Sequence, residues 1–272
     1  MRPPHDDLIV VRGGGDIATG VVWRLHHAGF RVLVTELSSP LSIRRTVSLS
    51  TAISEGQIEI EGLVGRRCES NTAVHRCWEL GEIPLIVAPM LSDIDLDDRM
   101  TAVIDGRLAK RPLDTTIADA PMVIGLGPGF IVGEHCHAVI ETMRGHRLGR
   151  VLLEGSAQPN TGSPGVIEGK SSERVLRAMQ HGTVEWYAAI GDWVEVGTVM
   201  GAIHGEQVVD VKAPFTGMIR GLITPDTQVS NGVKIADVDP RNDPSACHQI
   251  SDKALAIGGG VVEALYRLRV EQ

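Results

Sequence analysis

The sequence predicts an α/β protein that carries a small all-β domain and ends in a helix. Three observations predict this fold class. Apolar runs lead into glycine-rich turns at 8–15 and 121–129. Short strands separated by turn residues fill 182–242, and an apolar face at helical spacing follows within 243–272. We therefore expect a first domain at 1–181, a β domain at 182–242, and a C-terminal segment at 243–272 whose helix packs back on the first domain.

The first domain opens on the most specific motif of the chain. Residues 8–11 are apolar and predict a buried strand, and a helical pattern begins at Asp16. Between them, Gly13, Gly15 and Ala18 fit the G-x-G-x-x-G/A pattern of a dinucleotide-binding βαβ unit. A pyrophosphate can approach such a glycine closely, and the N–H groups of the helix N-terminus favour its charge. The motif predicts a Rossmann-like domain with the cofactor contacts Gly13, Gly14, Gly15, Asp16 and Ala18.

Glu36 is the predicted ribose-binding acid. It lies 21 residues after Gly15, just past a second strand at 30–34. A carboxylate there accepts a hydrogen bond from a ribose 2′-hydroxyl and repels a 2′-phosphate, so it favours NAD over NADP. The alternative is a βαβ unit whose glycines serve only tight packing.

Two arginines follow on a short helix predicted at 39–53. Arg44 and Arg45 would contact a phosphate or carboxylate of the ligand, because a guanidinium suits bidentate contacts of that kind. A solvated pair on the helix surface is the alternative. Further on, the aspartates within 93–98 predict a solvated loop, since the glycine and glutamate of a calcium-binding loop are missing.

The second glycine turn follows the buried strand that begins at Pro121. Loops at the carboxyl ends of strands converge in an open α/β sheet, so Gly127 and Gly129 are expected beside the first turn. The two turns would then share one ligand crevice. The alternative is a turn that only reverses the chain.

His137 and Glu141 are the predicted catalytic residues, with a helix expected at 138–142. An imidazole can donate or accept a proton near neutral pH. No metal site is expected, because adjacent residues such as His135, Cys136 and His137 rarely point at one centre. The remaining predicted ligand contacts, which suit an anion or a pterin edge, are Arg144, Asn160 and Thr161.

The β domain contains a repeat offset by 35 residues, because Val194–Gly197 matches Val229–Gly232. Its glycine and Ala-Pro pattern resembles the biotinyl/lipoyl barrel-sandwich hybrid. In those carriers the modified lysine sits at a hairpin tip before the Ala-Pro. The corresponding residues here, 204–207, include no lysine, and Lys212 directly precedes Ala213. The resemblance implies the fold, and we expect no bound biotin or lipoate.

The last segment predicts a helix with Ser251 as its N-cap. Gly258, Gly259 and Gly260 interrupt its apolar face at a cost of about 1 kcal/mol each. Such glycines are expected to permit the close approach of another backbone.

Composition excludes several classes of function. The chain has 272 residues and a formal charge of −8, which argues against binding to nucleic acid or to a membrane surface. Aromatic residues make up 3%, too few for base-stacking platforms. No apolar run is long enough for a transmembrane helix, the N-terminus lacks a signal-peptide core, and the four cysteines are dispersed. We expect a cytoplasmic protein with reduced thiols that forms either a monomer or a homo-oligomer.

The order of motifs over nearly the whole chain resembles the YqeB-type family, accessory proteins of selenium-dependent molybdenum hydroxylase systems. The segments that carry the resemblance are 11–20, 124–130, His137 with Glu141, 144–150, 159–162 and 250–254. The resemblance implies a maturation factor that works with a molybdenum hydroxylase apo-enzyme or with its maturation proteins.

The ligand is therefore expected to be NAD or the molybdenum cofactor as molybdopterin dinucleotide, held without a covalent bond. The alternative function is an NAD-dependent oxidoreductase that acts on a small molecule, for which His135 or His137 with Glu141 would serve.

Overall fold

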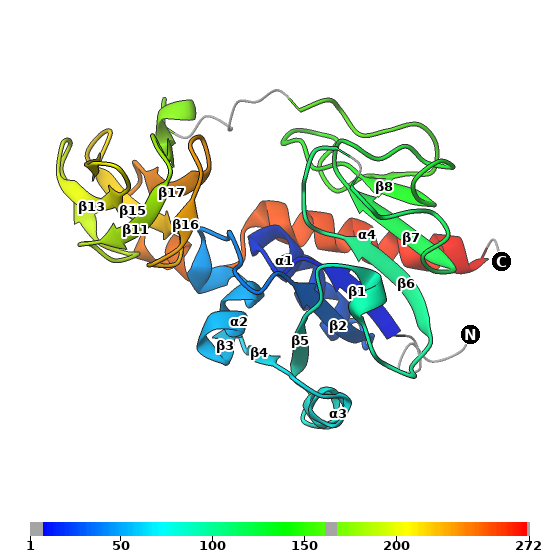
Figure 1. Cartoon of the computed structure of the whole chain (residues 1–272). Helices are drawn as coiled ribbons and strands as arrows, with labels where there is room; N and C mark the ends of the chain where they lie inside the picture. Colours follow the sequence, from blue (N-terminus) through cyan, green and yellow to red (C-terminus); the bar gives the residue numbers. More distant parts are fainter. Residues whose placement is uncertain (1–7, 112, 161–167, 271–272) are drawn as a thin grey trace. The chain divides into compact units, whose positions relative to one another are not determined.

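The computed structural model describes residues 8–111, 113–160 and 168–270 (Figure 1). The chain forms two compact units. Unit 1 comprises Met1–Ser38, Ser48–Thr161 and Ile250–Gln272, and unit 2 comprises Ser39–Val47 and Gly162–Gln249. Each unit is discontinuous in sequence, and each is described by itself.

Unit 1 is built on one nine-stranded sheet, with strand order β3-β4-β5-β2-β1-β6-β7-β8-β9. The strands are β1 (Leu8–Arg12), β2 (Arg31–Glu36), β3 (Gln57–Ile60), β4 (Leu63–Arg67), β5 (Ile83–Val87), β6 (Met100–Asp105), β7 (Met122–Leu126), β8 (Ala138–Ile140) and β9 (Val151–Leu152). The two edge strands, β3 and β9, run antiparallel to their neighbours, and the strands between them are parallel. Every residue of β1 and β7 is buried, which explains their continuous apolar runs.

The helices of unit 1 are α1 (Asp16–His27), α2 (Ala52–Glu55), α3 (Asn71–Glu79) and α4 (Asp252–Val270), with short 3₁₀ turns at Leu49–Thr51 and Leu91–Asp93. The α-helices α1 and α4 pack against each other through small residues. A Cβ placed on Gly20 would lie 2.5 Å from the Cβ of Ala254, and one on Gly258 would lie 2.6 Å from the Gly20 carbonyl oxygen. Arg24 also lies against Gly258. The two helices therefore run in the same direction, and their N-termini lie on the same side.

Unit 2 consists of two four-stranded antiparallel sheets, with orders β10-β17-β15-β12 and β14-β13-β11-β16. Its strands are β10 (Val175–Arg177), β11 (Gly182–Trp186), β12 (Trp193–Val194), β13 (Val199–His204), β14 (Val208–Lys212), β15 (Gly217–Leu222), β16 (Gln228–Val229) and β17 (Lys234–Asp239). Short 3₁₀ turns lie at Arg45–Val47, Ser172–Arg174 and Pro244–Cys247. The core includes Ile43 from the early segment, and the Leu222 N–H donates to the Ile43 carbonyl at 2.8 Å.

The predicted fold class is wrong. A Rossmann-like domain has a parallel, doubly wound sheet, whereas the sheet of unit 1 is mixed, with antiparallel strands at both edges. In the described residues between β6 and β7, and between β7 and β8, no crossover helix occurs. The helix expected at 138–142 is instead the buried strand β8. Its Ala-Val-Ile run is too short to distinguish strand from helix by periodicity.

The β part of the fold prediction is corrected as well. Unit 2 contains two separate four-stranded sheets rather than the expected barrel-sandwich hybrid. One sheet includes β10, and unit 2 also includes residues 39–47, so both contributions come from outside 182–242. The helix predicted at 39–53 is not formed over most of its length. Residues 39–47 instead join unit 2, and only Ala52–Glu55 is α-helical.

Candidate functional site

The carboxyl ends of β1, β6, β7 and β8 meet at one edge of the unit 1 sheet, because these strands are parallel neighbours. Each strand is followed there by polar residues. Gly13–Asp16 follow β1, 106–111 follow β6, and 127–129 follow β7, while Glu141 directly follows β8. The helix N-termini of α1 and α4 lie on this side of unit 1. This edge is therefore the candidate site.

The first glycine turn is filled by the chain itself. Gly13 has a φ of +88°, which favours glycine, and its N–H donates to the Thr35 carbonyl at 2.8 Å. Ser50 lies directly against Gly14: its N–H donates to the Gly14 carbonyl at 2.9 Å, and a Cβ on Gly14 would lie 2.8 Å from the Ser50 nitrogen. Backbone therefore covers Gly14, the residue before the glycine that a pyrophosphate is expected to approach.

Glu36 completes this arrangement. Its Oε2 accepts a hydrogen bond from the Gly14 N–H at 2.8 Å, and its Oε1 accepts one from the Leu37 N–H at 2.8 Å. Burial raises the pKa of Glu36, and these two N–H groups oppose the rise. The carboxylate expected to hold a ribose therefore holds the turn. Ala18 and Gly15 have structural contacts too: Ala18 packs beside Gly106, and the Gly15 carbonyl accepts from the Thr19 N–H at 2.8 Å.

A buried network of charged side chains joins β1 to β6 and to the loop after β6. Arg12, only 1% exposed, donates to Asp114 at 2.6 Å and to the Thr115 hydroxyl at 2.7 Å. Arg107 donates to both Asp105 and Asp114 at 2.6 Å. The hydrogen bonds from Arg12 and Arg107 lower the pKa of Asp114 to about 2, although burial opposes this fall. Every guanidinium in this network has a carboxylate partner.

The second glycine turn is also packed by protein. Gly127 has a φ of +76°, and a Cβ there would collide with the Thr142 side chain. Gly129 has a φ of +108°, and a Cβ there would lie 2.6 Å from the Arg111 nitrogen. The turn thus brings the loop after β6 and the loop after β8 together. It lies at the same edge as the first glycine turn.

His137 and Glu141 are not brought together, because they lie at opposite ends of β8. The His137 Nδ1 accepts a hydrogen bond from the Val123 N–H at 2.9 Å, and burial lowers the pKa of His137. Glu141 is 2% exposed and accepts from the N–H groups of Met143 at 2.7 Å and Gln158 at 2.8 Å. Glu141 therefore organises the backbone of the loops around it.

Four charged side chains act electrostatically on Lys253. It lies in the first turn of α4, and its pKa is lowered by burial and by the positive charges of Arg144 and Lys110. The negative charges of Asp16 and Glu141 act on it in the opposite sense. Arg144 also forms a two-pronged pair with the exposed Asp252, at 2.9 and 3.0 Å. We call Lys253, Lys110, Arg144, Asp16 and Glu141 the Lys253 cluster.

The remaining predicted contacts lie elsewhere. Arg44 and Arg45 belong to unit 2, where Arg44 donates to the Ala246 carbonyl at 3.0 Å and Arg45 to the Leu222 carbonyl at 2.8 Å. Asn160 is exposed in unit 1. Thr161 lies outside the described residues.

Sequence reasoning missed Lys253 and the buried network of Arg12. Lys253 is not predicted as a site residue because it follows an N-cap in an ordinary helix start. Arg12 is not predicted because it is the last residue of an apolar strand. A charged residue at the last position of a buried strand was the available signal, since such a charge must find a partner.

No family model matches the chain. It is 45% identical over 271 residues to the uncharacterized protein YqeB of Escherichia coli K12, an alignment that covers 98% of this chain and 49% of that protein. The chain thus spans about half the length of the curated relative that it matches, and the motif order expected for YqeB-type proteins agrees with this similarity.

Solved structures give only distant matches. An aspartoacylase family protein of Mesorhizobium loti is 13% identical, covers 85% of this chain and 84% of its own, and has a TM-score of 0.28. A succinylglutamate desuccinylase of a Silicibacter species is also 13% identical with the same coverage, and its TM-score is 0.26. These TM-scores are too low to indicate a shared fold.

Two further properties concern the described part of the chain. No helix there is long and apolar enough to cross a membrane. No group of three or more His, Cys, Asp or Glu side chains is arranged there to hold a metal ion.

Proposed function

We propose that unit 1 binds a phosphate-bearing ligand at the Lys253 cluster, and that the ligand is a nucleotide or the nucleotide form of the molybdenum cofactor. The single observation that carries the proposal is the place of Lys253 in the first turn of α4, whose N-terminus lies on the same side as that of α1. Burial and two neighbouring cations disfavour its charged form. An ammonium in this state gains more from an incoming anion than a solvated lysine does.

The surroundings of Lys253 support an anion rather than a cation. The N-termini of α1 and α4 lie on the same side, and both macrodipoles favour negative charge there. The loop that carries Lys110 holds Leu108 and Lys110 at φ values of +53° and +63°. Non-glycine residues with such backbone angles are strained and concentrate at binding sites.

The proposed position differs from the one expected from the glycine motif. The N–H of Gly14 donates to Glu36, and Ser50 lies against Gly14, so Gly14 is not free to contact a pyrophosphate. Phosphate groups would instead contact Lys253 and Arg144, and Lys110 would add positive charge. Selectivity for NAD over NADP therefore does not follow from Glu36.

The biological role that we propose is maturation of a molybdenum hydroxylase. Its support is the similarity to the YqeB sequence together with the motif order described above. In this role the chain holds the cofactor as cargo and transfers it to the apo-enzyme or to another maturation protein.

Calorimetry tests the binding site. Pyrophosphate, NAD and GDP are titrated into the wild type, into Lys253→Met and into Lys212→Met, a matched control whose lysine is exposed in unit 2. Lys253→Met should weaken binding about tenfold or more, and tenfold corresponds to about 1.4 kcal/mol. Equal affinity in all three proteins would remove the proposed site.

The role is tested in cells that depend on the chain for a molybdenum hydroxylase. Lys253→Met and Arg144→Ala should lower hydroxylase activity and its molybdenum content. His137→Ala should not, because His137 lies at the other end of β8. Equal protein levels and melting temperatures control for folding. Normal hydroxylase activity with Lys253→Met would contradict the role.

A further inference from the structure

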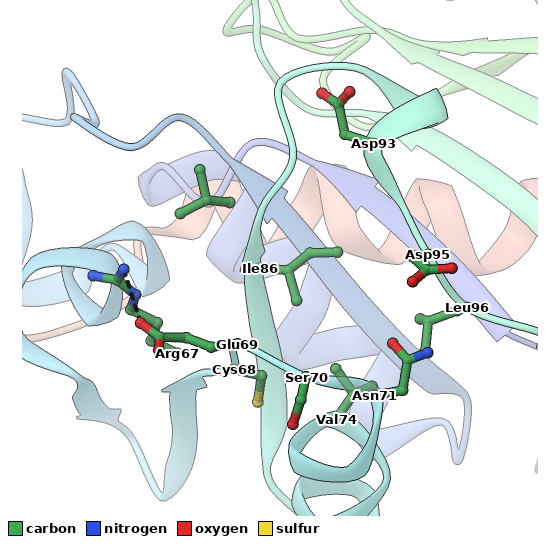
Figure 2. A pocket seen from close by; sticks show the side chains of 11 residues that line it. Arg67, Cys68, Glu69, Ser70, Asn71, Val74, Ile86, Asp93, Asp95 and Leu96 are labelled. Atoms are coloured by element: carbon green, nitrogen blue, oxygen red, sulfur yellow. Dashed lines mark ion pairs between the residues drawn. The ribbon is translucent and has the colours of Figure 1, made fainter.

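A cavity of about 600 Å³ lies in unit 1 at the carboxyl ends of β4 and β5, beside the start of α3 (Figure 2). Strand β2 lies between β5 and β1, the first strand in this direction that is followed by a residue of the Lys253 cluster. The volume falls within the range of about 300–1,000 Å³ that is usual for small-molecule sites. The function proposed above makes no use of this cavity.

The floor of the cavity is apolar. Val74 of α3, Ile86 of β5 and Leu96 contribute hydrocarbon surface, and the buried Cys68 lies beside them (Figure 2). These residues also pack against the core of unit 1. A rigid apolar floor of this kind suits the hydrocarbon body of a small ligand.

The polar rim carries an excess of negative charge. Three carboxylates, those of Glu69, Asp93 and Asp95, face one guanidinium, that of Arg67. Arg67 already pairs with Glu69 at 3.0 Å and donates to the Ile53 carbonyl at 2.9 Å.

Asp93 and Asp95 differ in what they contact. Asp93 accepts a hydrogen bond from the Met90 N–H at 2.8 Å. Among the residues that the structure describes, the side chains of Asp95 and Asn71 have no hydrogen-bond or ion-pair partner. Figure 2 places both at the same side of the cavity. Two oxygen acceptors are thus available next to an apolar floor.

We propose that this cavity binds a small organic amine. Its ammonium group donates to the Asp95 carboxylate and to the Asn71 amide oxygen, and its hydrocarbon body covers Val74, Ile86 and Leu96. The negative rim repels an anion of the same shape. A neutral molecule of the same shape lacks the Coulombic attraction between an ammonium and the Asp95 carboxylate. This attraction is stronger where the ligand displaces water. The inference is independent of the phosphate-bearing ligand, because it concerns different strands and the opposite charge.

Ligand-detected NMR and calorimetry on the whole chain test this site with three probes of similar shape: 2-phenylethylamine, 2-phenylethanol and 3-phenylpropionate. We expect the amine to bind at least about tenfold more tightly than the alcohol, and the carboxylate to bind more weakly than either. Asp95→Asn should reduce this preference to less than about threefold. The matched control is Asp97→Asn, which removes an exposed carboxylate from the same loop that does not line the cavity. It should leave amine binding unchanged.

Three results would overturn the proposal. The first is equal affinity for the amine and the alcohol. The second is an equal loss of amine affinity in Asp95→Asn and Asp97→Asn. The third is displacement of the amine by millimolar calcium in the wild type but not in Asp95→Asn. The last result would assign the rim to a metal ion. Because Asp95 is exposed, its substitution does not threaten the fold, and an unchanged melting temperature verifies this.

Discussion

Two charged clusters share one edge of the unit 1 sheet, and they treat their positive charges differently. In the network of Arg12 and Arg107, each guanidinium lies 2.6 Å from a carboxylate oxygen. In the Lys253 cluster, burial and the charges of Arg144 and Lys110 lower the pKa of the lysine. The difference teaches that cationic residues at the same edge of a sheet can have different roles, one structural and the other suited to a ligand. The first cluster is already neutralised and joins β1 and β6 to the loop after β6, whereas the second is where we propose that an anion binds.

The largest effect expected from this comparison follows removal of Arg12. Arg12→Met removes a buried guanidinium that donates to Asp114, to the Thr115 hydroxyl and to the Pro89 carbonyl, and breaking a buried ion pair costs about 3–5 kcal/mol. Hydrogen exchange of the β1 and β6 amides, followed by mass spectrometry, measures it. The matched control is Arg76→Met, which breaks an exposed pair with Glu79 and should cost less than about 1 kcal/mol. A similar loss in the free energy of unfolding for both variants would mean that the Arg12 network does not stabilise this edge of the sheet.

A smaller effect concerns the glycines that bring α4 and its Lys253 to this edge. Gly258→Ala should destabilise unit 1 by about 1–3 kcal/mol, because the new Cβ would lie 2.6 Å from the Gly20 carbonyl oxygen. Gly259→Ala meets no atom within 4 Å and should stabilise the helix by up to about 1 kcal/mol. Urea unfolding of both variants measures the difference. Destabilisation by Gly259→Ala would show that the glycines act through something other than this contact.

The smallest effect is the loss of stability at low pH that follows protonation of Asp114. Asp114 has a pKa of about 2 in the folded chain, below the 3.8 of an ordinary aspartate. Its contribution to stability is therefore present above pH 3.8 and is lost as the pH falls toward 2. Unfolding midpoints measured across this window should fall less steeply for Asp114→Asn than for the wild type. The same slope for both proteins would mean that the network does not lower the pKa of Asp114 in the folded chain.

Local sequence patterns predicted part of unit 1 well, because they depend on near neighbours. The apolar run at 8–11, the helix that begins at Asp16 and the glycine at position 13 all form the predicted local structure. The Ser251 hydroxyl accepts from the Ala254 N–H at 3.2 Å, as expected of an N-cap. Gly258 and Gly260 face backbone, as the interruption of the helix indicated.

What could not be predicted depends on distant partners. Nothing in the G-x-G-x-x-A pattern indicates that Ser50 will occupy the space over Gly14. Nor does the pattern indicate that Glu36 will turn toward Gly14. The charges around Lys253 come from segments more than 100 residues away in sequence. The strand at 138–140 is decided by pairing with β7, a long-range contact that local propensity does not contain.

Residues 39–47 have a consequence for synthesis of the chain. They are made early, yet Arg45 and Arg44 contact Leu222 and Ala246, which are synthesised 177 and 202 residues later. Unit 1 waits in the same way for α4, whose Gly258 rests on Gly20. Domains that are continuous in sequence can fold one after another as they emerge. Here neither unit can close before translation has passed residue 250, so both remain exposed to proteases and chaperones for most of the time the chain is being made.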